Sequence, residues 1–218
     1  MLAIENVSPI HGLSPERHQF IEYSKILGGG GFSQLRELDG DRVLKLTCCE
    51  ATHRLFDALQ GDTVATRARR HLPQVFEAWG ECATDPDKML YRGYVLERLY
   101  TPEELESKFS LSLGPTGARA ADWLEQLQRR LLAEEAALGA AQEHYTRKGA
   151  PGWESALHIA KALTDDERVE TRDAFGFLGA FCYKKKIDLD LRTAGNVLFG
   201  TDLRLVLADP VTKYIPVH

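Results

Sequence analysis

The sequence predicts an α+β fold with two parts, a small antiparallel sheet followed by a mainly helical region. Over residues 25–99 short apolar segments alternate with Gly and Asp turns, which is typical of antiparallel strands. After residue 100 the composition shifts toward Ala, Glu, Arg and Leu at helical spacing. We therefore expect a sheet with one helix over residues 1–100 and a truncated helical part over residues 101–218.

In the first part, Ser14 followed by Pro15 and Glu16 is the pattern of a capped helix start, and it predicts a helix to about residue 23. The spacing of Leu55, Phe56 and Leu59 predicts the one helix of the sheet region. Its expected range is 50–60. Residues 25–46 are expected to form a glycine-loop hairpin, with 28–31 in the loop and 32–38 after it, and a third strand at 43–46; further extended segments are expected over 71–76 and 91–99.

The second part is expected to contain three helices and a closing pair of strands. Thr164 and Glu167 form a capping box, which predicts a helix start there. This helix is expected to run to about residue 186 and to bury Phe175, Leu178, Phe181 and Cys182; the other helices cover residues 102–108 and 118–148, and the strands cover 197–199 and 205–207.

Charge and hydropathy limit the classes of partner. The formal charge is −5 and no long basic run is present, so direct nucleic-acid binding is not expected. No window approaches the eighteen consecutive apolar residues of a membrane span, so no membrane partner is expected. We expect a soluble, cytoplasmic protein.

Polar residues at both ends of the predicted closing hairpin suggest phosphoryl-transfer chemistry. Asn196 precedes the first strand and Asp209 follows the second, and both carry the oxygen ligands that magnesium prefers. Asp190 lies six residues before Asn196, where it is expected to accept the proton of an incoming hydroxyl; Asp188 is the alternative. Arg192 is expected to neutralise the transferring phosphoryl group. Asp and Asn are also common turn residues.

A glycine run stands where a nucleotide-binding loop is expected. Its members Gly28, Gly30 and Gly31, followed by Phe32 and Ser33, match the start of the G-x-G-x-[FY] pattern, with Ser33 where a third glycine is usual. Glycines let backbone amides approach phosphates, so these five residues are expected to bind ATP. Taken alone, such a run is as typical of a flexible turn.

Three further residues complete the predicted ATP site. Lys45 lies in an apolar strand segment and is expected to contact the α- and β-phosphates, although a solvent-facing lysine on an edge strand is the common alternative. Backbone groups at Glu97 and Leu99 are expected to bind adenine. The acidic partner of Lys45 is left open between Glu50 and Asp57.

With these motifs the chain resembles the short serine/threonine protein kinases of lytic short-tailed bacteriophages. The resemblance is carried by five segments that together span nearly the whole chain. They are residues 27–33, 43–46, 72–76 with Leu-Pro-x-Val-Phe, 194–199, and 207–211 with Asp-Pro-Val.

The resemblance implies a two-lobed protein-kinase-like fold that uses ATP and magnesium, with bacterial host proteins as substrates in the host cytoplasm. It implies Lys45 for the ATP phosphates, Asp190 as the catalytic Asp, and Asn196 and Asp209 as metal ligands. Few residues follow Asp209, so an activation loop is not expected and the enzyme is expected to be constitutively active. The alternatives are a pseudokinase that inhibits a host protein and a small-molecule phosphotransferase of the aminoglycoside or choline type.

Overall fold

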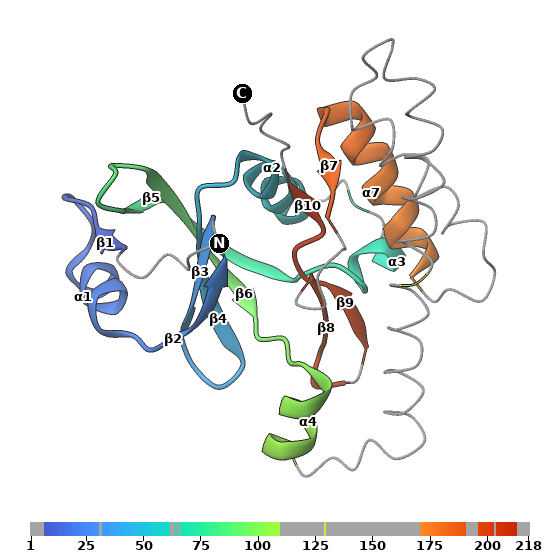
Figure 1. Cartoon of the computed structure of the whole chain (residues 1–218), viewed down its shortest axis with the longest axis horizontal. Coiled ribbons are helices and arrows are strands. Elements are labelled where there is room, and N and C mark those ends of the chain that lie inside the picture. Colours follow the sequence, from blue (N-terminus) through green and yellow to red (C-terminus); the bar gives the residue numbers. More distant parts are fainter. Residues whose placement is uncertain are drawn as a thin grey trace. The chain divides into compact units, whose positions relative to one another are not determined.

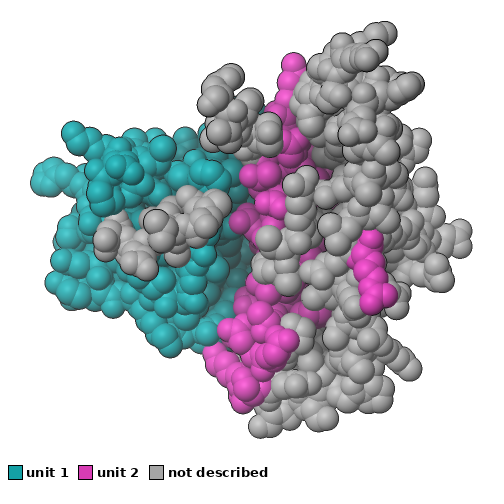
Figure 2. All heavy atoms as spheres, viewed as in Figure 1, with its two compact units in different colours: residues 1–63, 74–98 teal, residues 64–73, 99–218 magenta. Residues whose placement is uncertain are grey.

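A computed structural model describes residues 7–30, 32–61, 64, 66–109, 129, 171–190, 196–202 and 204–212 (Figure 1). Contacts divide the chain into two units, coloured separately in Figure 2. Unit 1 holds Met1–Thr63 and Gln74–Arg98, and unit 2 holds Val64–Pro73 and Leu99–His218. Val64–Pro73, which the sequence pattern assigns to the first part, therefore belongs with unit 2 by its contacts.

Unit 1 is built on a six-stranded antiparallel sheet in the order β1-β5-β6-β4-β3-β2. The predicted glycine hairpin and the strand after it are confirmed, since β2, β3 and β4 are neighbours. The strands are β1 (Ser8–Pro9), β2 (Ile26–Gly30), β3 (Ser33–Glu37), β4 (Arg42–Thr47), β5 (Val75–Thr84) and β6 (Leu90–Glu97). With the two helices below, the α+β class is confirmed.

The two faces of this sheet carry different side chains, because side chains alternate along each strand. On one face Leu44, Leu46 and Val95 form an apolar core with Ile21 of helix α1 (Pro15–Tyr23). As predicted, α1 begins at a hydroxyl cap, and the Ser14 Oγ accepts a hydrogen bond from the Arg17 amide at 3.4 Å.

Helix α2 (Glu50–Gln60) packs on the other face of the sheet, where the Phe56 ring lies edge-on to Tyr94 with centroids 5.1 Å apart. The predicted bounds of this helix are confirmed. Its predicted core residues Leu55, Phe56 and Leu59 are buried, because they share one side of the helix.

The described part of unit 2 contains the predicted closing hairpin, in which Val197 pairs with Leu207 and Phe199 with Leu205. A second strand pair, β7 with β10, was not predicted, because two-residue strands give no periodic signal. The elements are α3 (Thr66–Arg69), α4 (Pro102–Phe109), α7 (Arg172–Lys185), β7 (Asp188–Leu189), β8 (Val197–Phe199), β9 (Leu205–Leu207) and β10 (Val211–Thr212).

Helix α7 confirms the predicted core and corrects the predicted start. Its four predicted core residues Phe175, Leu178, Phe181 and Cys182 are buried. The helix begins at Arg172, because Thr171 has φ −91° and ψ 10° and its carbonyl accepts the first helical bond from Phe175. Thr164 and Glu167 lie outside the described residues, as does the predicted helix over residues 118–148.

Among the described helices, none combines the length and apolar character needed to cross a membrane.

Candidate phosphoryl-transfer site

Three polar residues of the predicted site lie at strand ends in unit 2. Asp190 directly follows β7, Asn196 directly precedes β8, and Asp209 comes two residues after β9. Because β8 and β9 are antiparallel, the end of β9, which leads to Asp209, lies beside the start of β8, which follows Asn196. The pairing of β7 with β10 brings Asp190 next to the same end, since β10 starts two residues after Asp209.

Hydrogen bonds join these strand ends into one cluster. The Asn196 side-chain amide Nδ2 donates to the Asp190 carbonyl at 2.8 Å. The Asp190 amide donates to the Pro210 carbonyl at 2.7 Å, and the Ala208 amide donates to the Asn196 carbonyl at 2.8 Å. The three predicted residues of unit 2 therefore lie on hydrogen-bonded neighbouring backbone segments. All three are half-buried, so each combines a fixed position with access to solvent.

The two candidate bases occupy different positions on β7. Asp188 lies inside the strand and pairs with Thr212, whereas Asp190 lies just beyond the strand and bonds to both Asn196 and Pro210. Both contacts of Asp190 involve its backbone, so the choice between Asp190 and Asp188 as the base stays a prediction. Arg192, the predicted phosphoryl-neutralising residue, lies outside the described residues.

The cluster has donor chemistry that fits magnesium. Because Nδ2 of Asn196 is directed at the Asp190 carbonyl, its Oδ1 is the amide atom left to face a cation. Asp209 adds a carboxylate whose Oδ1 is buried. Within the described ranges no group of three or more His, Cys, Asp or Glu is arranged to hold a metal. One amide and one carboxylate suffice where magnesium also takes water and phosphate oxygens.

In unit 1 the glycine run forms the β2–β3 hairpin, with Gly28 opposite Leu35 and Gly30 opposite Ser33. A Cβ on Gly28 or Gly30 would meet no atom within 4 Å, so the backbone there is open to a ligand. A Cβ on Gly29 would lie 2.6 Å from the Ser33 carbonyl oxygen. Gly29 is therefore required by strand packing, which the motif did not reveal; Gly31 lies outside the described residues.

Lys45 occupies an interior strand rather than an edge, since β4 lies between β3 and β6. Its side chain is 5% exposed, and its Nζ lies 5.6 Å from the centroid of the Phe56 ring on α2. Lys45 pairs with Leu35, which pairs in turn with Gly28. Directly paired residues share a face, so the open glycine backbone and Lys45 lie on the same side of the sheet.

The two acids considered as partners of Lys45 both make other contacts. The Glu50 carboxylate accepts a hydrogen bond from Arg54 at 2.9 Å, which lowers the pKa of Glu50. Asp57 accepts a hydrogen bond from the Tyr94 hydroxyl at 3.2 Å and lies 3.9 Å from an Arg92 nitrogen. The partner of Lys45 stays open between Glu50 and Asp57.

Burial shifts the pKa values of Tyr94 and of His53 beside it. Burial raises the pKa of Tyr94 to about 12, and nearby Asp57 adds to the rise. Burial lowers the pKa of His53, with a further lowering from Arg92. The His53 Nδ1 lies 3.4 Å from the Tyr94 hydroxyl. At neutral pH a neutral His53 and Tyr94 therefore accompany Lys45 on the α2 face.

A residue that the motifs did not reveal anchors the tip of the glycine hairpin. The Thr47 hydroxyl donates to the Phe32 carbonyl at 3.0 Å and accepts from the Cys49 amide at 3.2 Å. The Cys48 amide also donates to the Phe32 carbonyl, at 3.0 Å. Because Thr47 lies two residues after Lys45, strand alternation would have placed both on one face. Thr47 thus joins the hairpin tip to the start of α2.

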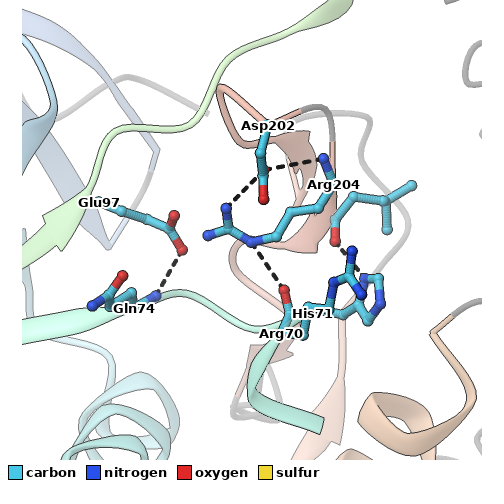
Figure 3. Close-up of polar contacts among 7 residues, drawn as sticks. Arg70, His71, Gln74, Glu97, Asp202 and Arg204 are labelled. Carbon is cyan, nitrogen blue, oxygen red and sulfur yellow. Dashed lines mark hydrogen bonds and ion pairs between the residues drawn. The ribbon is translucent and has the colours of Figure 1, made fainter. Parts of the chain in front are cut away.

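The predicted adenine-binding backbone lies at the end of β6. The Glu97 amide donates to the Gln74 carbonyl at 3.1 Å, and the Glu97 carboxylate accepts from the Gln74 amide at 2.9 Å (Figure 3). Within the described ranges the Leu99 amide has no acceptor, whereas the Glu97 amide is already used.

Neither a scan against protein-family models nor a search of curated proteins finds a match for this chain. The resemblance to phage kinases therefore rests on the residues themselves.

Proposed function

We propose that this protein transfers the γ-phosphoryl group of ATP, with magnesium, to Ser or Thr hydroxyls of proteins. The observation that carries the proposal is the hydrogen-bonded cluster of Asp190, Asn196 and residues 208–210. It combines a possible base with two hard oxygen ligands, the set that phosphoryl transfer by protein kinases needs. We further propose that the fold is a reduced form of the two-lobed protein-kinase fold.

In unit 2, the Asp190 carboxylate accepts the proton of the substrate hydroxyl as its oxygen forms a bond to the γ-phosphorus and the bond to the β-phosphate oxygen breaks. Asn196 and Asp209 would hold magnesium, which would neutralise charge on the phosphates. The hydrogen bond from Asn196 to the Asp190 carbonyl keeps the base and the metal ligand in a constant relation.

In unit 1, three features support nucleotide binding. The open backbone at Gly28 and Gly30 accommodates phosphates, because no side chain occupies that space. Lys45 presents its cation on the same face of the sheet, as expected for a contact with the α- and β-phosphates. Lys45 lies on the interior strand β4, so its position relative to the glycine hairpin is fixed by strand pairing.

The substrate class follows from the resemblance to phage kinases, and we propose proteins of a bacterial host. To test this, the purified chain is incubated with magnesium and γ-labelled ATP, alone and with bacterial lysate, and labelled proteins are separated on a gel. Asp209→Asn keeps the size of the side chain and removes its charge. We expect transfer to fall by roughly 100-fold or more, as for the loss of other transition-state electrostatic groups.

Asp188→Asn is the matched control, because it makes the same change on β7 two residues before Asp190. Asp190→Asn should abolish labelling and Asp188→Asn should spare it; the reverse result reassigns the base. Equal labelling by wild type and Asp209→Asn contradicts the proposal, since a contaminating kinase would then be the source.

A folded wild-type protein that labels nothing also contradicts a protein kinase. Consumption of ATP only when metabolites are added then identifies a small-molecule phosphotransferase. Binding of ATP without any turnover identifies a pseudokinase.

A further inference from the structure

The segment Val64–Pro73 leaves unit 1 after α2, docks on the closing hairpin of unit 2 and returns to begin β5. Three hydrogen bonds hold it there. The Leu207 amide donates to the His71 carbonyl at 2.9 Å. The His71 Nδ1 lies 2.8 Å from the Leu205 carbonyl, and the Arg204 Nε donates to the Arg70 carbonyl at 3.0 Å (Figure 3). The segment thus serves β9 as a second backbone neighbour beside β8.

The contact of His71 with the Leu205 carbonyl determines which nitrogen of the imidazole ring carries the proton. A carbonyl oxygen only accepts hydrogen bonds, so the Nδ1 atom facing Leu205 must carry the proton. The other tautomer would set two lone pairs against each other at 2.8 Å. His71 is 7% exposed, so water does not readily replace the contact.

The position of this contact links His71 to the metal ligand. Its side chain and its own carbonyl bind Leu205 and Leu207, the first and last residues of β9. Asp209 follows only two residues later. β9 has only three residues, and β8 beside it is bonded on its other side to Tyr100, so the bonds from His71 are those that hold the outer edge of β9.

We propose that His71 is a positioning residue for Asp209, clamping β9 so that the carboxylate and Asn196 keep the relation that metal binding requires. The role of His71 in holding β9 does not depend on the activity of the protein, whereas its effect on catalysis rests on the proposed function. His71 itself contacts no reacting atom in this proposal.

The test compares His71→Asn with His71→Leu in the full chain. The two side chains have nearly the same shape, but only Asn has a donor at the position of Nδ1. We expect His71→Leu to lower kcat for protein phosphorylation by roughly 10- to 100-fold, as for other small displacements of catalytic groups. The KM for ATP should change much less, because the nucleotide contacts of unit 1 are untouched. His71→Asn should recover most of the lost kcat.

Two measurements test whether His71 holds β9 without relying on an enzyme assay. Nitrogen NMR of the wild type should show His71 with a protonated Nδ1, and hydrogen exchange should be faster at the Leu207 amide in His71→Leu than in His71→Asn. A neutral ring protonated only at Nε2 overturns the proposal, even if His71→Leu does not fold. So does full activity of His71→Leu.

If the wild type transfers no phosphate, the proposed function fails. The clamp is then judged by the NMR and exchange results alone.

Discussion

Replacing Thr47 by Val keeps the shape of a fully buried side chain and removes only its hydroxyl. Two contacts are lost with it, the bond to the Phe32 carbonyl at 3.0 Å and the bond from the Cys49 amide at 3.2 Å. The Phe32 carbonyl keeps the Cys48 amide at 3.0 Å, so it stays satisfied. The Cys49 amide, at the start of α2, loses an acceptor.

The expected cost follows from these two losses. An unsatisfied buried donor costs about 1–3 kcal/mol, and the bond to an oxygen that keeps another donor contributes about 0.5–1.5 kcal/mol. Cys49 is only half-buried, so the lower part of the summed range applies, and we expect Thr47→Val to lower the free energy of unfolding by about 1.5–3 kcal/mol. Thr47→Ser keeps both bonds and loses one methyl group, for which about 0.8 kcal/mol is expected.

Urea unfolding followed by fluorescence, in chains that keep Trp79 and carry Phe in place of Trp123 and Trp153, measures this difference within unit 1, because Trp79 lies on β5 against the apolar core. ATP binding should also weaken in the Val variant, since the hairpin tip loses one of its two anchors. The reasoning is refuted if Val and wild type differ by less than about 0.5 kcal/mol, the usual range for substitutions without structural consequence. A Ser variant as unstable as Val would refute it equally, because the hydroxyl would then be irrelevant.

Three other outcomes are expected. His53 has a pKa lowered by burial, so its contribution to stability is present above its unfolded pKa of 6.5 and is lost as the pH falls toward the folded value; His53→Gln should flatten urea midpoints measured between pH 7 and 5. Arg98 donates to Glu37 at 2.5 Å, and Arg98→Met should lower the free energy of unfolding in urea by on the order of 1 kcal/mol; an unchanged free energy at both low and high salt would exclude a role for this pair. Phe175 is fully buried on α7, and Phe175→Ala should cost about 3–5 kcal/mol by calorimetry, with under 1 kcal/mol contradicting its place in the core.

Local signals predicted the elements with regular spacing. The helix at Glu50–Gln60, the strands Val197–Phe199 and Leu205–Leu207, and the buried face of α7 all appear where periodicity placed them. Short elements such as β7 and β10 were not predicted, because two residues carry no period and form a strand only through their partner. The start of α7 was misplaced, since a capping pattern at Thr164 says nothing about the backbone at Thr171.

Local sequence signals also left out part of the candidate site, namely the contacts that only the fold creates. Motif spacing predicted Asp190, Asn196 and Asp209 as site residues, but it could not show that Asn196 and Pro210 hydrogen-bond to the backbone of Asp190. Thr47 was overlooked because its hydroxyl bonds a residue fifteen positions away.

The amino-acid pattern alone was enough to propose candidate residues for phosphoryl transfer and to predict most of the described helices and strands, because both depend on residue type and near neighbours. It was not enough to show that Lys45 lies on an interior strand, that it shares a face with Gly28, or that His71 holds β9. These relations arise from strand order and register and from contacts between residues up to 136 positions apart, the separation of His71 and Leu207, and only folding of the chain brings such residues together.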